Sequence, residues 1–374
     1  KRLIVLCDGT WQDSTEPSAG EYPSNVTRFA RALSKYGFDE SGEELEQIVY
    51  YQKGVGTGLM DSLFGGVLGL GVSANVRAGY SFLAHNYDEG DSIYFFGFSR
   101  GAYTARAIAS LVAETGLLTK RGMDSFPKLY NTYYSFRNAR RSESSEAKQQ
   151  ARELMRSLGK DQISLSAAQA VRIVGVWDTV GFHKPWVANW LVMFKALGFR
   201  FDQERIEFCD TEIPTPIQYG FHALALDERR KAFEPTMWTL PKIEEGGRTP
   251  VLKQVWFSGV HTDVGGGRDD HRLSDIAFAW MISECSKTRL LAFDQKYLLR
   301  KTLYDPYFAS EDGGQTPWWT IHGATDSGES GAKSFFKKAA EAMAGTGPRR
   351  PLSRMGPTNE MIHQSIGDRS FGNN

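Results

Sequence analysis

Short, nearly continuous apolar segments recur along this chain, with helical patterns between them. Such segments are typical of strands that are buried on both faces of a sheet. They are Leu3–Cys7, Ile48–Gln52, Ser92–Phe96, Val171–Trp177 and Val251–Phe257. Helices are predicted at Val26–Lys35, Ala74–Asn86, Ala102–Glu114, Glu143–Leu158 and Leu273–Cys285. This alternation predicts an α/β fold, with a mostly parallel central sheet and helices on both faces.

The length of 374 residues fits either two domains or one large α/β domain with insertions, at about 150 residues per domain. We expect a single domain over 1–374 with an apolar insertion at 183–220 and a loop-rich insertion at 305–351. The first insertion contains Pro185–Phe201, which is more apolar than a surface helix needs. It is predicted to cap the functional site, and a core helix packed on the sheet is the alternative.

Charge and cysteine content exclude several classes of protein. The 44 basic and 44 acidic residues leave no net field to attract a polyanion, so nucleic acid is not an expected partner. Three scattered cysteines fit neither a disulfide framework nor a zinc site, and we expect no metal and no cofactor. No apolar stretch is long enough to span a membrane, although peripheral membrane contact stays open. A cytoplasmic location is expected, and because the chain starts at Lys1 a removed signal peptide stays open.

The motif with the clearest chemistry is Gly97-Phe98-Ser99-Arg100-Gly101. It directly follows a predicted strand and opens a predicted helix, which is the context of a nucleophile elbow. In such an elbow a strained strand-to-helix turn exposes the serine, and the small residues beside it avoid clashes with the neighbouring backbone. Ser99 is therefore the predicted nucleophile. The structural alternative is a serine that only caps the helix.

A serine hydroxyl needs a base and an orienting acid, and in α/β-hydrolases these follow the serine in the order acid, then histidine. Asp178 directly follows Val171–Trp177, and His261 closely follows Val251–Phe257. Both therefore lie where strands deliver residues to the carboxyl edge of a parallel sheet. We predict His261 as the base and Asp178 as its orienting acid.

Other residues compete for these roles. His222 lies in an apolar segment interpreted as helical, where a hydrogen-bonded core histidine is expected; it is the second choice as base. His363 is expected either to be structural or to support a site residue without touching the substrate. Asp263 is a competing acid, but it is only two residues from His261, and an orienting carboxylate normally comes from another segment.

An oxyanion needs preorganised donors. The backbone N–H of Arg100 is one predicted donor, and Gly9 or Thr10, after the first strand, is the other. Asp8, beside them, is expected to stabilise this loop. The residues expected to contact the substrate are Trp11, Phe98, Trp186 and Trp190.

Six motifs in sequence order resemble a large family of uncharacterised α/β-hydrolases of fungi and bacteria, related to type VI secretion phospholipase effectors. They are Cys7-Asp8-Gly9-Thr10-Trp11, Gly54-Val55-Gly56-Thr57, Gly97-Phe98-Ser99-Arg100-Gly101-Ala102, Val176-Trp177-Asp178-Thr179-Val180-Gly181, His222-Ala223-Leu224-Ala225-Leu226-Asp227-Glu228 and Gly259-Val260-His261-Thr262-Asp263-Val264-Gly265-Gly266-Gly267. Six ordered matches are far more specific than any one of them.

This resemblance implies an α/β-hydrolase-like sheet with an apolar cap over the serine, and phospholipid substrates in the effector branch. By motif match it implies the same three residues, Ser99, Asp178 and His261. We therefore expect a serine ester hydrolase that cleaves lipophilic or lipid esters through an acyl-enzyme. A thioesterase or metabolite esterase is one alternative, and a non-catalytic pseudo-hydrolase that binds a ligand or partner is the other.

Overall fold

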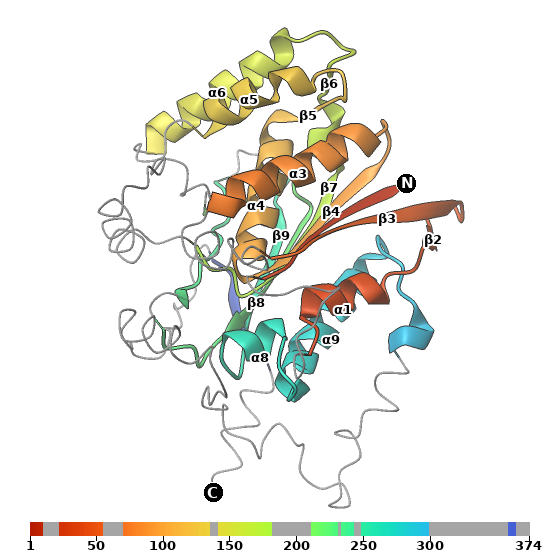
Figure 1. The fold of residues 1–374 in the computed structure, drawn as a ribbon, viewed down its shortest axis with the longest axis vertical. Helices are drawn as coiled ribbons and strands as arrows, with labels where there is room; N and C mark the ends of the chain where they lie inside the picture. Colours follow the sequence, from red (N-terminus) through yellow and green to blue (C-terminus); the bar gives the residue numbers. More distant parts are fainter. Residues whose placement is uncertain are drawn as a thin grey trace, which may run out of the picture.

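The computed structural model describes residues 1–9, 22–54, 70–134, 141–181, 211–230, 233–242, 248–298 and 358–363. The strands of its main sheet are β1 (Arg2–Cys7), β2 (Tyr36–Phe38), β3 (Glu44–Gln52), β4 (Ser92–Phe98), β7 (Val171–Trp177), β8 (Tyr219–Ala225), β9 (Val251–Phe257) and β10 (Glu360–Ile362). They form one eight-stranded sheet in the order β10-β9-β8-β7-β4-β1-β3-β2 (Figure 1). A second, two-stranded sheet pairs β5 (Leu117–Leu118) with β6 (Ile163–Ser164).

Neighbouring strands of the main sheet are parallel, apart from the antiparallel pair β2–β3. The predicted mostly parallel sheet is therefore confirmed. In a parallel sheet the carboxyl ends of the strands meet at one edge. Here β4, β7, β8 and β9 are consecutive neighbours, so the segments that follow them are brought together.

Helices cover both faces of this sheet. The α-helices are α1 (Asn25–Ala32), α3 (Leu70–Asn86), α4 (Ser99–Thr115), α5 (Phe126–Tyr133), α6 (Arg141–Ser157), α8 (His261–Gly265) and α9 (Arg272–Thr288). In Figure 1, α3 and α4 lie on one face of the sheet, and α1 and α9 on the other. None of the helices in the described ranges combines the length and the hydrophobicity that crossing a membrane requires.

The alternation of side chains along β1 explains the two layers. Leu3 and Val5 join the apolar cluster under α3 and α4, whereas Ile4 and Leu6 join the cluster under α1 and α9. Successive side chains of a strand point to opposite faces, so a central strand that is covered on both sides must be apolar throughout. This is why β1 is a continuous apolar segment with both faces buried.

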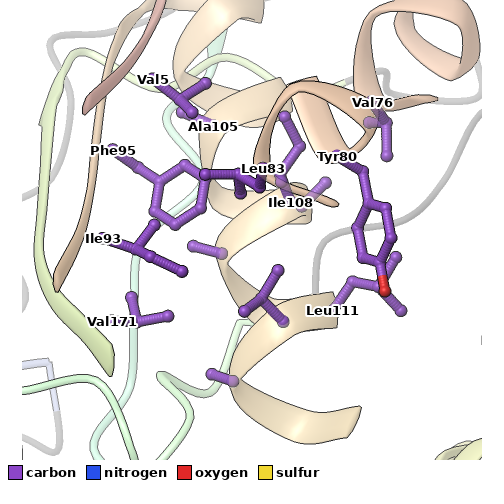
Figure 2. Packing of buried hydrophobic residues seen from close by; sticks show 14 of the residues in the cluster. Val5, Val76, Tyr80, Leu83, Ile93, Phe95, Ala105, Ile108, Leu111 and Val171 are labelled. Carbon is purple, nitrogen blue, oxygen red and sulfur yellow. The ribbon is translucent and has the colours of Figure 1, made fainter. Parts of the chain in front are cut away.

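Figure 2 shows the larger of the two apolar clusters, with strand residues on one side and helix residues on the other. Phe95 and Ile93 of β4 face Ile108 of α4, and Tyr80 of α3 lies near Leu111. The Tyr80 hydroxyl is buried but accepts a hydrogen bond of 2.9 Å from the Leu118 backbone N–H. This layer fixes α4, and therefore its first residue Ser99, against the sheet.

One strand was predicted wrongly. The segment that contains His222 is strand β8, between β7 and β9, and not the helix expected from its composition. A short apolar run that is buried on both faces carries no periodicity that separates strand from helix. The predicted insertion 183–220 also extends too far, because Tyr219 already begins β8 and Ile213 is packed in the core.

The other predictions about insertions lie outside the described residues. This applies to 183–210, which contains most of the predicted cap, and to 305–351. Next to the edge strand β2, β3 starts at Glu44, four residues before the predicted strand. Glu44 and Glu46 in its first half are exposed and Leu45 between them is half-buried, so this polar start lacked the apolar run used to predict strands.

The fold generates a prediction about stability. Leu111→Ala removes a side chain that is 0% exposed, so it should lower the free energy of unfolding by about 2–5 kcal/mol. Leu165→Ala is the matched control, because Leu165 is 47% exposed and its loss should change stability by less than about 0.5 kcal/mol. Urea unfolding followed by circular dichroism measures both. Equal effects of the two changes would contradict the described core.

Candidate active site

Ser99 lies at a sharp turn between β4, which ends at Phe98, and α4, which starts at Ser99 itself. Its φ of 58° is in the left-handed region, which non-glycine residues seldom adopt and which is typical of functional turns. Phe98 occupies the N-cap position and Ser99 is the first helical residue, so the serine does not serve as the helix cap. The geometry is that of a nucleophile elbow.

The two glycines of the motif make this turn sterically possible. A Cβ atom at Gly97 would lie 2.7 Å from the backbone of Ala102. A Cβ atom at Gly101 would overlap the carbonyl oxygens of Cys7 and Asp8 at the end of β1. Since the neighbouring atoms are backbone, they cannot move aside without displacing the sheet or the helix.

Hydrogen bonds connect the three predicted catalytic side chains in a row. His261 Nε2 lies 2.8 Å from Ser99 Oγ, and His261 Nδ1 lies 2.6 Å from Asp178 Oδ2. The other oxygen of Asp178 accepts a bond of 3.0 Å from the Ala225 backbone N–H, so this fully buried carboxylate is satisfied at both oxygens. The structure therefore brings together residues that are 162 positions apart in the sequence.

Burial governs the protonation of His261. Removal from water lowers the pKa of this imidazole, and the hydrogen bond and negative charge of Asp178 oppose that shift without cancelling it. Aromatic rings add to the burial: the Phe98 ring centroid is 4.6 Å from the imidazole and that of Phe233 is 4.7 Å away. The ring is therefore neutral at neutral pH, with one nitrogen able to accept a proton.

The competing acid and the competing base are engaged elsewhere. Asp263 accepts a bond of 2.9 Å from the Val260 backbone N–H and pairs with Arg268 at 3.3 Å. His222 is buried, accepts from the Thr179 backbone N–H at 3.1 Å, and lies 3.1 Å from Gln254 Oε1. These contacts are those of a core histidine, on a strand instead of the expected helix.

His363 also has a packing contact. Its ring stacks on Phe257 with 4.6 Å between the ring centroids. Phe257 is the last residue of β9, so His363 joins the end of β10 to its neighbouring strand. This contact is consistent with the structural role expected for His363.

Of the three residues predicted to supply oxyanion donors, the structure describes Gly9 and Arg100. The backbone N–H of Gly9 already donates to Asp8 Oδ1 at 2.7 Å, so Gly9 is not an available donor here, and Thr10 lies outside the described residues. Arg100 occupies the first turn of α4, where the helix dipole favours a negative charge. Burial lowers the pKa of the Arg100 guanidinium to about 10, so it stays protonated at neutral pH.

Asp8 has the structural role expected of it. Its Oδ2 accepts bonds from Ser24 Oγ at 2.7 Å, Thr27 Oγ1 at 2.9 Å and Tyr51 Oη at 2.6 Å. Burial raises the pKa of this carboxyl, and the hydrogen bonds act in the opposite direction. The cluster ties the end of β1 to α1 and β3, beside the turn that carries the serine.

The predicted substrate contacts can be placed only in part. Trp11, Trp186 and Trp190 lie outside the described residues. Phe98 is only 3% exposed and packs between the imidazole of His261 and the glycines Gly9 and Gly265, where a Cβ atom would meet its ring. Phe98 thus supports the imidazole of His261, and its contact with substrate stays a prediction.

Three residues near His261 were not predicted. Glu228 Oε2 lies 3.3 Å from the His261 backbone nitrogen, Arg230 forms a bidentate pair with Glu228, and Phe233 contacts the imidazole with its ring edge. The only sequence signal was the motif that ends at Glu228. Within the described ranges, no three His, Cys, Asp or Glu side chains are arranged to hold a metal ion.

A mostly parallel sheet with a serine, a histidine and an aspartate joined at its carboxyl edge is an α/β-hydrolase-like fold. Comparison with known families agrees with this class. Residues 1–284 match the family described as type VI secretion system (T6SS) phospholipase effector Tle1-like, catalytic domain. The chain belongs to that family.

Individual relatives are distant. An uncharacterised protein of Saccharomyces cerevisiae is 26% identical over 265 residues, which cover 64% of this chain and 34% of that protein. The structure of the Tle1 effector bound to the VgrG spike of the type VI secretion system matches at 19% identity and a TM-score of 0.33, over 73% of this chain and 52% of that one. An uncharacterised protein from Pseudomonas aeruginosa matches at 17% identity and a TM-score of 0.41, over 82% and 48%.

The chain thus spans about a third of the yeast relative and about half of each solved structure.

The elbow generates a prediction about Gly101. Gly101→Ala places a methyl group against the backbone of β1, so the turn must shift and Ser99 with it. We expect loss of soluble, folded protein or a fall in the melting temperature of several degrees. Gly159→Ala is the control, because the nearest atom to its Cβ belongs to the movable side chain of Asp161. Unchanged thermal melting of the Gly101 variant would contradict the described turn.

Proposed function

We propose that this protein is a serine ester hydrolase that cleaves lipid esters through an acyl-enzyme. Ser99 would be the nucleophile, His261 the general base and Asp178 the residue that orients the imidazole. One observation carries the proposal. A serine in a left-handed turn is hydrogen-bonded at 2.8 Å to an imidazole whose other nitrogen lies 2.6 Å from a buried carboxylate.

The first half of the reaction follows from these positions. His261 Nε2 takes the Ser99 proton as Oγ attacks the ester carbonyl, and the carbonyl π electrons move to the oxygen. Asp178 keeps the proton of the imidazole on Nδ1, so Nε2 is the nitrogen with the free electron pair. The tetrahedral species then collapses, the ester C–O bond breaks, and the imidazolium gives its proton to the leaving alcohol.

Water completes the cycle. It enters in place of the alcohol and gives a proton to His261 as it attacks the acyl carbon. Collapse of the second tetrahedral species breaks the bond to Ser99 Oγ, which takes the proton back from His261. The products are a carboxylic acid and the free serine, so atoms and charge balance.

The oxyanion of both tetrahedral species needs a donor. The backbone N–H of Arg100, directly after the serine in the first turn of α4, is the donor that we propose. In this structure Gly9 donates to Asp8, so a second donor would have to come from another residue or from a changed position of Gly9.

Membership of the phospholipase effector family supports a lipid ester as substrate. The chain spans about half of the Tle1 structure, so its substrate is proposed from family and site together. A thioesterase and a metabolite esterase would use the same three residues. A phospholipid in vesicles, an acyl-thioester and a short p-nitrophenyl ester should be compared, and we expect the highest kcat/KM with the phospholipid. Preference for the thioester or for the short ester would overturn the substrate proposal while leaving the mechanism intact.

Replacement of the nucleophile tests the mechanism. Ser99→Ala should lower kcat by about 10³-fold or more, because the acyl-enzyme cannot form. Ser258→Ala is a matched control: Ser258 is also buried, and its hydroxyl has no hydrogen-bond partner within the described part of the chain. Hydrolysis of the phospholipid in both variants should be followed by release of fatty acid. Near-wild-type turnover by Ser99→Ala would refute the assignment.

The pH dependence follows from the lowered pKa of His261. The base must be neutral, so kcat/KM should fall as the pH drops through this pKa and should level off above it. Burial holds the pKa below its ordinary value of 6.5, so the midpoint of the acid limb is expected below pH 6.5. Initial rates across buffers of constant ionic strength measure it. A midpoint above about pH 7 would contradict the described environment of the imidazole.

A further inference from the structure

The backbone N–H groups of His261 and of the two residues before it each donate a hydrogen bond to a different buried carboxylate. Gly259 donates to Asp227 at 2.8 Å, Val260 to Asp263 at 2.9 Å, and His261 itself to Glu228 at 3.3 Å. All three carboxylates are buried. Because each of these N–H groups has its own side-chain acceptor, the backbone at 259–261 is held in one position.

Glu228 is the member of this set that is paired with a cation at both oxygens. Arg230 Nε lies 2.9 Å from Oε1, and Arg230 Nη2 lies 2.8 Å from Oε2. Burial alone would raise the pKa of Glu228, but the hydrogen bonds and charge of Arg230 hold it at about 2. Glu228 is only 3% exposed, and yet this lowered pKa keeps it an anion at neutral pH.

Arg230 also reaches the imidazole through an aromatic ring. Its guanidinium carbon lies 3.8 Å from the Phe233 ring centroid, in the range of a cation–π contact. The Phe233 ring in turn meets the His261 ring edge-on at 4.7 Å. His261 is therefore contacted at its backbone by Glu228 and at its ring by Phe233, and Arg230 touches both of these residues.

We propose that Glu228, Arg230 and Phe233 are positioning residues for the base: Glu228 fixes the backbone of His261, Phe233 fixes its ring, and Arg230 locks the two together and balances the charge beside the imidazole. The inference rests on the proposed function, because it assigns these residues a task in orienting His261 for proton transfer. None of the three is assigned contact with the reacting atoms.

The charges around the imidazole predict in which direction each substitution should shift the pKa of His261. Asp178, after β7, and Glu228, after β8, raise the pKa of His261, whereas Arg230 lowers it. Asp263 lies on α8 itself, two residues away, and is paired with Arg268. Removing the cation at 230 and removing the anion at 228 should therefore shift the titration of His261 in opposite directions.

The kinetic test uses three variants of the full chain. Glu228→Ala should lower kcat by about 10- to 100-fold with little change in KM, because the acceptor for the His261 backbone is lost. Glu228→Gln keeps an acceptor oxygen and should recover most of that loss, with the acid limb of the pH profile moved to lower pH. Arg230→Met should move the limb to higher pH.

Lys253→Met is the control, because it removes a cation from another pair, with Glu284 at 2.6 Å, on β9 and α9. Its acid limb should match that of the wild type. The proposal would be overturned if Glu228→Gln lost as much kcat as Glu228→Ala. It would also be overturned if the acid limbs of the Glu228→Gln and Arg230→Met profiles did not move in opposite directions.

An NMR titration separates failure of this inference from failure of the proposed function. With ¹³C-labelled histidine, the ring of His261 can be titrated in each variant whether or not the protein hydrolyses an ester. Opposite shifts of its midpoint in Glu228→Gln and Arg230→Met support the positioning role even if no activity is found. An active wild type whose His261 titrates identically in both variants would refute the inference and leave the proposed function standing.

Discussion

The register of the parallel strands β4, β7, β8 and β9 is the constraint on which the site depends. These four strands are consecutive neighbours, and their backbone pairing continues past the strand ends: Asp178 N–H donates to Ala223 O at 2.7 Å, and Leu226 N–H donates to Phe257 O at 3.0 Å. Residues far apart in the sequence are placed by a ladder that the apolar core fixes on both faces. The side-chain hydrogen bonds then join Ser99, His261 and Asp178, which the backbone has already brought close together.

Burial gives this arrangement its chemistry and also its cost. Because the imidazole of His261 is shielded from water, it is neutral and can accept a proton. The fixed dipoles around it need not reorganise as charge develops on the ring. However, carboxylates such as Asp178, Asp227 and Glu228 are also buried, and each is stable only because backbone N–H groups or a cation satisfy it. The bonds to Asp227 and Glu228 also fix the backbone that carries the base.

The sequence predicted the parts of the fold and site that depend on local pattern. Strands such as β4 and β7 are continuous apolar segments, and Ser99 and Asp178 follow directly at their carboxyl ends. Since all parallel strands end at one edge, strand order was not needed to predict that these residues and His261 would lie together. The nucleophile elbow could be predicted from its motif, because the backbone approaches so closely at Gly97 and Gly101 that only glycine fits there.

The parts that were missed depend on tertiary placement. Without β8 between β7 and β9, nothing linked Glu228 to the backbone of His261, 33 residues further on. Phe233 and Arg230 follow from the same placement. Gly9 was predicted as an oxyanion donor from its position after β1, but the adjacent carboxylate of Asp8 takes its N–H group, which no spacing rule could indicate.

The central claim is that the hydroxyl of Ser99 is an activated nucleophile, and covalent labelling tests it most directly. The folded protein should be treated with a fluorophosphonate and the adduct located by mass spectrometry of its peptides. The account predicts a single phosphonyl group on Ser99, formed rapidly in the native protein, slowly when His261 is replaced, and not after unfolding. A native protein that stays unlabelled at Ser99, or that is labelled at another residue, would contradict it.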